Sequence, residues 1–405
     1  MKINTKYYYI FQPTLNKHLQ FYIGWVNEAR NRGIPIRLLT FYPLQRYIKD
    51  IKKIIKLTKG ENAIIVPVLP GFKKITMTIF FLTQRCFSNN IVVHLRKVDS
   101  KPFAFLKRLL KNFRVIIDLE GDPASERDYL LNHPYKPNFY NNRVRSYEKN
   151  VTRLKEDLSI CDTAICVNDQ LKKLLSNRHP EFASKFRVLP TGVDTHRFYF
   201  DLKERNKIRK DLNIEGKLVF VFCGSLYYSW QNISTTLNFF KTIKNRYKNA
   251  YFILLTSKAD FPIAEEFIKK YDISCNDLLL RNVPNEEVRG FLNASDIGVL
   301  LRHDHIMNRV ASPGKIGEYV ACGLTLLTTR ATTIHSDILE KTGQAILIED
   351  MDDNNEFVEK IDEYVKQIKN RENELKRRRE FIKENVRFYS NSDYGELYFH
   401  ILKNK

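Results

Sequence analysis

The sequence predicts an α/β protein with two doubly wound, parallel-sheet domains. Short runs of β-branched and aromatic residues alternate with longer helical patterns along the whole chain, which is the order expected of βαβ units. The chain has 405 residues, enough for two domains of roughly 100 to 200 residues each. Hydrophobic residues make up 43% and charged residues 28%, a balance that supports buried cores and excludes wholesale disorder.

Strand-like runs form two series, one on each side of residue 191. We expect domains at 1–195 and 203–385, because turn residues give way to a charged helix in the intervening VLPTGVDTHRFYFDLKERN. After 350 the pattern is helical as far as 387, and SDYGELYFHILKNK, within 386–405, predicts a final amphipathic helix. The runs of the first series are KYYYIFQ, PIRLLTF, NAIIVPVL, NIVVHLR, FRVIIDL, TAICVN and FRVLP. Those of the second are KLVFVFCG, YFILLTS, LLLRNV, IGVLLR, LTLLTTR and QAILIED.

Positive charge is concentrated in the first half of the chain. Residues 1–200 hold 35 Lys+Arg against 16 Asp+Glu, whereas residues 201–405 hold 32 against 30. The first half is therefore expected to meet an anionic surface, whether nucleic acid, anionic lipid or a phosphate-bearing acceptor. Three basic amphipathic segments favour contact with a membrane surface, although each is also consistent with a core helix that has a solvated basic face. These segments are RYIKDIKKIIKLTKG, GFKKITMTIFFLTQRCF and FAFLKRLLKNF, the last with Leu106, Leu109, Leu110 and Phe113 expected on one apolar face.

Cysteine usage and hydropathy indicate a cytoplasmic protein. The six cysteines are scattered without a CxxC pair, as expected for reduced thiols rather than a zinc site or a disulfide framework. The start MKINTKYYYIFQP lacks an apolar signal core, and no run approaches the roughly 18 apolar residues of a membrane span. The mixed-sign run RENELKRRRE predicts a solvated helix face rather than a nucleic-acid tract.

The segment ASPGKIGEYVACG, between two second-series strands, carries the strongest site signal. Ser312 is expected to cap a helix that begins at Pro313. Lys315 then lies in the first turn, where a cation is unfavourable unless an anion binds, and Gly314 permits close approach to the backbone. Glu318 follows on the same face. The alternative is an ordinary capped helix with an ion pair between Lys315 and Glu318.

A second candidate is FCGSLYYSWQN, where Gly224 and Ser225 end a strand and a helix follows. It has one glycine where a dinucleotide-binding fingerprint has three, so taken alone it is better explained by a tight strand-to-helix turn. Tyr227, Tyr228 and Trp230 are suited either to stack on a base or sugar or to fill the core.

A third candidate is IIDLEGDPASERDYL, where five carboxylates follow one another closely after a strand: Asp118, Glu120, Asp122, Glu126 and Asp128. Such carboxylates suit magnesium or manganese. The alternatives are an acidic loop that lines a cleft and a merely solvated loop.

Four segments together resemble the retaining glycosyltransferases of the GT-B fold (glycosyltransferase family 4-like, group 1 type). They are TGVDTHRF, FCGSLYYSW, NVPNEEVRGFLNASDIGVLLR and NRVASPGKIGEYVACGLTLLTT. The resemblance covers most of 190–350 and implies two facing Rossmann-like domains, with a C-terminal helix that returns to the first. In such enzymes the second domain binds a nucleotide-sugar and the first binds the acceptor.

The resemblance also implies roles for individual residues. Glu318 matches the later glutamate of the family's pair, which holds the ribose hydroxyls, whereas the earlier position is Val310. The family commonly places a cation seven residues after the first phosphate-loop glycine, and here that position is Gln231. Residues expected to contact the donor are Gly224, Ser225, Arg302, Arg309, Ser312, Gly314, Lys315 and Glu318, with the three cations substituting for the missing one.

The expected function is transfer of a sugar from a nucleoside-diphosphate donor to a polysaccharide or lipid-linked oligosaccharide acceptor in envelope polysaccharide biosynthesis. Retention is implied, and no metal or cofactor is expected, since side chains and a helix terminus can neutralise the diphosphate. The expected partners are the nucleotide-sugar, the glycan acceptor and an anionic membrane surface, without specific nucleic acid, at the inner face of the plasma membrane. The residues expected to act on the acceptor side are His94, Asp118 and Glu126.

Two other functions fit parts of the sequence. A sugar-nucleotide epimerase of the same fold would need a carboxylate or histidine beside the donor sugar and would release free nucleotide without an acceptor. A non-enzymatic polyanion or nucleic-acid binder would explain the basic first half, but not the SPGK segment, and no RNA- or DNA-binding module is present in the sequence.

Overall fold

The chain forms two compact units in a computed structural model that describes residues 5–11, 18–59, 63–96, 98–133, 137–332, 344–367 and 391–403. Unit 1 comprises Met1–Glu126, Arg145–Pro190 and Asn391–Lys405, and unit 2 comprises Arg127–Val144 and Thr191–Ser390. Each unit is built on a parallel sheet, so the predicted fold class of two doubly wound domains is confirmed.

Unit 1 has a seven-stranded sheet in the order β3-β2-β1-β4-β5-β6-β7. All neighbouring pairs are parallel. The order reverses between β1 and β4, where Tyr9 pairs with His94, and ligands of such sheets bind beyond the carboxyl ends of the strands at this kind of position. The strands are β1 (Thr5–Phe11), β2 (Ile36–Pro43), β3 (Ala63–Val68), β4 (Asn90–Arg96), β5 (Phe113–Leu119), β6 (Thr163–Cys166) and β7 (Phe186–Val188).

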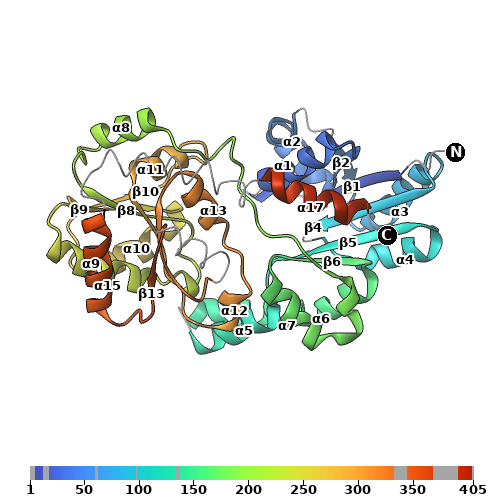
Figure 1. The fold of residues 1–405 in the computed structure, drawn as a ribbon. Helices are drawn as coiled ribbons and strands as arrows, with labels where there is room; N and C mark the ends of the chain where they lie inside the picture. Colours follow the sequence, from blue (N-terminus) through green and yellow to red (C-terminus); the bar gives the residue numbers. More distant parts are fainter. Residues whose placement is uncertain are drawn as a thin grey trace. The chain divides into compact units, whose positions relative to one another are not determined.

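The first helix and the last helix of the chain lie together in unit 1. α1 (His18–Asn31) and the C-terminal α17 (Asn391–Lys403) pack side by side, as the blue and red helices of Figure 1 show. Tyr398 and Leu402 of α17 join one apolar cluster with Tyr9 and Val92 of the sheet. The predicted C-terminal helix and its return to the first unit are therefore confirmed.

The other helices with residues in unit 1 follow the expected strand–helix alternation. α4 differs in detail, because its buried positions are Phe103, Leu106 and Leu110, whereas Leu109 is exposed. The predicted common face of Leu106, Leu109, Leu110 and Phe113 is therefore wrong: the buried stripe follows spacings of three and four from Phe103, and Phe113 already begins β5. The helices are α2 (Leu44–Thr58), α3 (Lys73–Arg85), α4 (Lys101–Leu109), α5 (Pro123–Asn132), α6 (Pro137–Ile160) and α7 (Asp169–Arg178), with α5 and α6 spanning the boundary between units.

Unit 2 has a six-stranded sheet in the order β10-β9-β8-β11-β12-β13, also parallel throughout. Its order reverses between β8 and β11, where Ile297 pairs with Phe220. All six strands of the predicted second series are present. They are β8 (Leu218–Cys223), β9 (Ala250–Leu255), β10 (Leu278–Arg281), β11 (Ile297–Leu300), β12 (Thr325–Thr329) and β13 (Ala345–Ile348).

Apolar clusters cover both faces of the unit 2 sheet. Alternate β8 residues separate between them: Phe220 and Phe222 join one cluster, and Val219 and Val221 join the other, as the period of two in a strand requires. The main helices of unit 2 are α8 (Leu202–Asp211), α9 (Ile233–Arg246), α10 (Phe261–Lys270), α11 (Val288–Ala294), α12 (Ile306–Arg309), α13 (Gly314–Ala321) and α15 (Asn354–Gln367).

Two further sequence predictions concern a charged run near the C-terminus and membrane-spanning helices. The run RENELKRRRE falls within 368–390, outside the described residues. Among the residues that are described, no helix combines the length and apolar composition needed to cross a membrane.

Candidate active site

The carboxyl end of β8 brings Gly224 into contact with Lys315. Gly224 has a φ of 149°, a conformation that side-chain-bearing residues rarely adopt. A Cβ atom at this position would lie 2.5 Å from Lys315 Nζ. Glycine is therefore required here both by the backbone and by the lysine that crosses it.

Two cations converge on one amide oxygen beside this turn. Lys315 Nζ donates to Gln231 Oε1 at 3.0 Å, and Arg302 Nη2 donates to the same oxygen at 3.2 Å. Arg302, two residues after the end of β11, also donates from Nη1 to the Trp230 carbonyl at 2.8 Å. Within the described ranges, neither Arg302 nor Lys315 forms an ion pair with a carboxylate. The cluster therefore holds positive charge without a carboxylate in ion-pair contact, and the charge of Glu318 opposes the lowering of the Lys315 pKa less strongly than desolvation favours it.

Burial makes this charge costly. Arg302 is 7% exposed, and desolvation lowers its pKa to about 10. Lys315 is half-buried as a residue, but its ammonium lies over the Phe222 ring, 4.3 Å from the centroid. Desolvation, reinforced by repulsion from Arg302, lowers the pKa of Lys315 to about 7. A bound anion would offset both costs, because an opposite charge favours the protonated forms.

The helix that carries Lys315 starts one residue later than predicted. α13 begins at Gly314, and the preceding Pro313 has a ψ of 113° and caps the helix without a side-chain hydrogen bond. The predicted capping by Ser312, with Pro313 as the first helical residue, is therefore wrong, because the proline adopts the extended conformation of a cap. Lys315 still falls in the first turn, as predicted.

Tyr319 fixes α13 against the sheet. Its hydroxyl accepts a hydrogen bond from the Cys223 backbone N–H at 3.0 Å. Its ring lies where a side chain of Gly298 would be, since a Cβ there would come within 2.3 Å of it. Glu318, the preceding residue, is half-buried. One helix thus positions Lys315 and Glu318 at the carboxyl edge of β8 and β11.

Two other predicted donor residues are exposed and form local contacts. Arg309 is exposed and pairs with Asp304, with Nε 2.6 Å from Oδ1, so it does not join Arg302 and Lys315. Ser225 is exposed, and its hydroxyl accepts from the Tyr227 backbone N–H. Gln231 was noted in the sequence only as the place of a missing cation, and its role as the shared acceptor depends on a contact that sequence spacing does not reveal.

The aromatic residues after Gly224 are half-buried rather than part of the core. Tyr228 and Trp230 stack on each other with centroids 4.2 Å apart and an angle of 14° between the rings. Trp230 also supplies the carbonyl that holds Arg302. The stacked pair is thus linked to the cation cluster through the Trp230 backbone.

In unit 1, His94 and Asp118 are joined in a buried network. His94 is 0% exposed, with Nε2 2.7 Å from Asp118 Oδ1 and Nδ1 2.7 Å from the Tyr398 hydroxyl. Both ring nitrogens are thus engaged, and the histidine connects β4, β5 and α17. Arg96 approaches Asp118 at 3.6 Å and forms an ion pair with Glu120.

The remaining acidic residues of this edge have separate partners. Asp122 is buried and contacts both Ser125 and Arg178. Glu126 is half-buried, with its carboxylate folded over Gly121, where an added Cβ would lie 2.5 Å from Oε1. Within the part of the chain that the structure describes, no three His, Cys, Asp or Glu side chains are grouped as a metal site.

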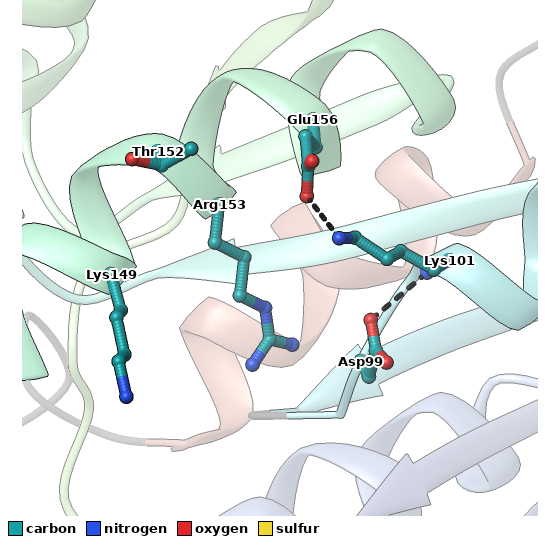
Figure 2. Close-up of a pocket in the computed structure, with 6 residues that line it drawn as sticks. All are labelled: Asp99, Lys101, Lys149, Thr152, Arg153 and Glu156. Atoms are coloured by element: carbon teal, nitrogen blue, oxygen red, sulfur yellow. Dashed lines mark hydrogen bonds and ion pairs between the residues drawn. The ribbon is translucent and has the colours of Figure 1, made fainter.

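A shallow pocket of about 410 Å³ lies between the start of α4 and α6. Figure 2 shows Lys149, Thr152, Arg153 and Glu156 on α6, with Asp99 and Lys101 opposite them. Lys101 Nζ lies 2.9 Å from Glu156 Oε2, and Arg153 Nε lies 3.2 Å from Asp157. Two of its three cations are therefore paired with carboxylates, in contrast to the cluster around Gln231.

Comparison with known proteins shows which family the segment that contains Gln231, Arg302 and Lys315 resembles. Residues 204–385 match the family model described as glycosyl transferases group 1. Unit 2 thus contains a glycosyl transferases group 1 domain. Gly224, Gln231, Arg302, Lys315 and Glu318 all fall within the matched residues. A group 1 domain supports glycosyl transfer as the activity. No curated protein matches the chain.

Solved structures extend the similarity to the whole fold. A glycosyltransferase from Rickettsia africae is 14% identical with a TM-score of 0.69, and the alignment covers 100% of both chains. Anabaena HepE, solved with UDP, is 10% identical with a TM-score of 0.67, covering 98% of this chain and 99% of that one. WaaG, a glycosyltransferase involved in lipopolysaccharide biosynthesis, is 11% identical with a TM-score of 0.63, covering 99% and 100%. The fold around the group 1 domain is that of GT-B glycosyltransferases.

Proposed function

We propose that the chain transfers a sugar from a nucleoside-diphosphate donor to a glycan or lipid-linked glycan acceptor. The observation that carries this proposal is the meeting of Arg302 and Lys315 on Gln231 without a paired carboxylate. Two cations that are both desolvated in this arrangement suit a ligand with about two negative charges. The proposed donor also agrees with the group 1 domain in which the cluster lies and with HepE having been solved with UDP.

The proposed chemistry is stabilisation of the leaving group. As the bond between sugar and diphosphate breaks, negative charge grows on the diphosphate, and the preorganised cations Arg302 and Lys315 hold that charge. Glu318 is proposed to accept hydrogen bonds from the ribose hydroxyls. Retention would follow if the departing diphosphate takes the acceptor proton on the face that it leaves. Neither a metal nor a cofactor is required in this scheme.

The acceptor is proposed to bind at the carboxyl edge of β4 and β5 in unit 1. Glu126, which begins the charged face of α5, is the candidate for direct contact. His94 and Asp118 are better suited to positioning, because His94 has no exposed surface and both of its nitrogens are bonded. A role in envelope polysaccharide synthesis is proposed by analogy with WaaG, which is involved in lipopolysaccharide biosynthesis. Location at the inner face of the plasma membrane is proposed from the basic charge of the first half of the chain.

Ligand titration tests the donor site. Calorimetry with nucleoside, nucleoside diphosphate and nucleotide-sugar should give tighter binding of both phosphorylated ligands than of the nucleoside. Lys315→Met should weaken diphosphate binding by roughly 1.5 to 3 kcal/mol, as expected for a lost charge-assisted contact, and leave nucleoside binding nearly unchanged. Glu318→Gln should weaken all three ligands, because it acts on the ribose that they share.

Lys207→Ala is the matched control. Its side chain is 75% exposed and pairs with Asp211 within α8, so its removal should not alter binding. If Lys315→Met and Glu318→Gln keep wild-type affinity for all three ligands while the circular dichroism spectrum is unchanged, the proposed donor site is wrong.

A further inference from the structure

Helix α3 presents a second apolar face to solvent. Met77 and Phe81 are buried against unit 1. Phe72, at the cap position, and Ile75, Ile79 and Leu82 are exposed, with Ile79 at 57%. Spacings of three and four residues place these four side chains on one stripe. The stripe lies on the opposite side of the helix from Met77 and Phe81.

α4 extends this apolar surface. It packs beside α3, with the Phe81 and Phe103 rings 6.0 Å apart. Phe105 and Leu109, four residues apart on α4, are 56% and 49% exposed. Large exposed side chains are unremarkable when scattered, but a set on two adjacent helices indicates a contact surface. The α3–α4 surface is defined here as Phe72, Ile75, Ile79, Leu82, Phe105 and Leu109.

Positive charge borders the α3–α4 surface. Lys73 and Lys74 occupy the first turn of α3, Arg108 lies in the last turn of α4, and all three are exposed. Residues 44–111 contain 15 Lys+Arg against 3 Asp+Glu, with no acidic residue between 62 and 98. An anionic surface complements this pattern, whereas a second copy docked through the same surface would bring like charges together.

We propose that unit 1 docks on bilayers with anionic headgroups by inserting the α3–α4 surface. The apolar side chains enter the boundary between headgroups and acyl chains, and the bordering cations contact the headgroups, as in interfacial amphipathic helices. Docking of this kind would bring the chain to a lipid-linked acceptor. It does not depend on the donor site, since all of its residues lie in unit 1.

A vesicle assay with matched variants tests this surface. Flotation of the full chain with phosphatidylglycerol–phosphatidylcholine vesicles should show salt-sensitive binding, weaker on pure phosphatidylcholine. Ile79→Ser combined with Leu82→Ser should reduce partitioning at least tenfold, because burial of those side chains is lost. The comparison is Leu44→Ser combined with Ile55→Ser on α2, a second basic amphipathic segment with these residues 40% and 52% exposed, because the proposal assigns insertion to α3 and α4 and not to α2. It should change partitioning less than twofold.

A depth measurement tests insertion. Ile79→Trp should show quenching by brominated acyl chains when vesicles are added, whereas Ile55→Trp should not, each measured against the wild-type signal from the two native tryptophans. Equal losses in the α3 and α2 double variants would overturn the proposal. So would binding that is insensitive to Ile79→Ser/Leu82→Ser, or a concentration-dependent dimer in ultracentrifugation that these substitutions dissociate.

The same preparations separate this proposal from the donor site. Nucleoside-diphosphate affinity of the α3 double variant should equal that of wild type, which also shows that the variant is folded. Loss of vesicle binding with intact nucleotide binding supports the α3–α4 surface. Vesicle binding that depends on Ile79 in a chain that binds no nucleotide would contradict only the proposed donor site.

Discussion

The two ends of strand β11 differ in how the charges beside them are paired. At the amino end, Asp296 accepts from Arg205 Nη2 at 2.5 Å, from Arg209 Nη1 at 3.2 Å and from the Val219 backbone N–H at 2.8 Å. At the carboxyl end, Arg302 and Lys315 share the neutral Gln231 amide. The cations at the amino end form direct ion pairs with a carboxylate, whereas no carboxylate is in ion-pair contact with Arg302 or Lys315 within the described residues.

This difference separates a structural network from a binding site. The Asp296 network is complete without a ligand: Arg205 also donates to the carbonyls of Asn293 and Ser295 and thereby ties α8 to the strand. The Gln231 cluster keeps positive charge in a partly desolvated position, which costs stability unless an anion binds. The location fits, because the carboxyl ends of β8 and β11 form the switch point of the sheet. Buried charges that contribute most to folding should therefore differ from those that bind the donor.

The largest expected effect is at the amino end. Asp296→Asn retains the shape but leaves two buried guanidinium groups without their carboxylate, and should lower the free energy of unfolding by about 3 to 5 kcal/mol. Urea unfolding followed by circular dichroism measures this loss. Asp211→Asn is the control, since that carboxylate is 54% exposed in a surface pair and should cost less than about 1 kcal/mol. If Asp296→Asn and Asp211→Asn lower the free energy of unfolding equally, the Asp296 network does not contribute more to stability than a surface ion pair.

At the carboxyl end of β11, removal of a charged side chain should raise the free energy of unfolding rather than lower it. Lys315→Met removes a cation that desolvation penalises and should raise the stability of the ligand-free protein by roughly 1 to 3 kcal/mol, because apolar replacement of desolvated charges is often stabilising. Saturating nucleoside diphosphate should stabilise wild type more than the variant, with about 2.7 kcal/mol expected at 100 times the dissociation constant. Thermal unfolding with and without ligand measures both effects. A destabilised ligand-free variant would assign Lys315 a structural role.

The pH dependence follows from the pKa of Lys315, lowered to about 7 by desolvation from its ordinary value of 10.5. Between these two pH values the unfolded chain binds a proton that the folded chain lacks, so stability should rise with pH in this window. Diphosphate binding favours the protonated lysine, so its affinity should fall as pH rises above about 7, with proton uptake on binding. Calorimetry in buffers of different ionisation enthalpy measures this uptake. Lys315→Met should abolish both trends.

The smallest effect is expected at Arg309. Because it forms an exposed pair with Asp304, Arg309→Ala should change stability by at most about 1 kcal/mol and leave diphosphate affinity within twofold of wild type. Calorimetric titration beside Lys315→Met provides the comparison. A tenfold loss of diphosphate affinity in Arg309→Ala would contradict this prediction. It would show that Arg309 contributes to donor binding together with Arg302 and Lys315.

Local sequence patterns predicted the elements of this fold well. The thirteen expected strands are all present because each is an apolar run bounded by turn residues or charges. Helix boundaries and exposed faces were less predictable. Ser312 did not cap α13, since the conformation of Pro313 moved the start of the helix, and Leu109 proved exposed because α4 buries the face of Phe103.

Periodicity and neighbours along the chain are enough to predict the α/β class, the parallel strands and the position of Lys315 in the first turn of a helix. Only the tertiary structure joined Gln231 to Arg302 and Lys315, 71 and 84 residues away, and His94 to Tyr398, 304 residues away. It also decided that α3 has an apolar face in solvent as well as one in the core. The physical reason is that desolvation and hydrogen bonding act between groups close in space, and sheet topology sets which distant groups meet.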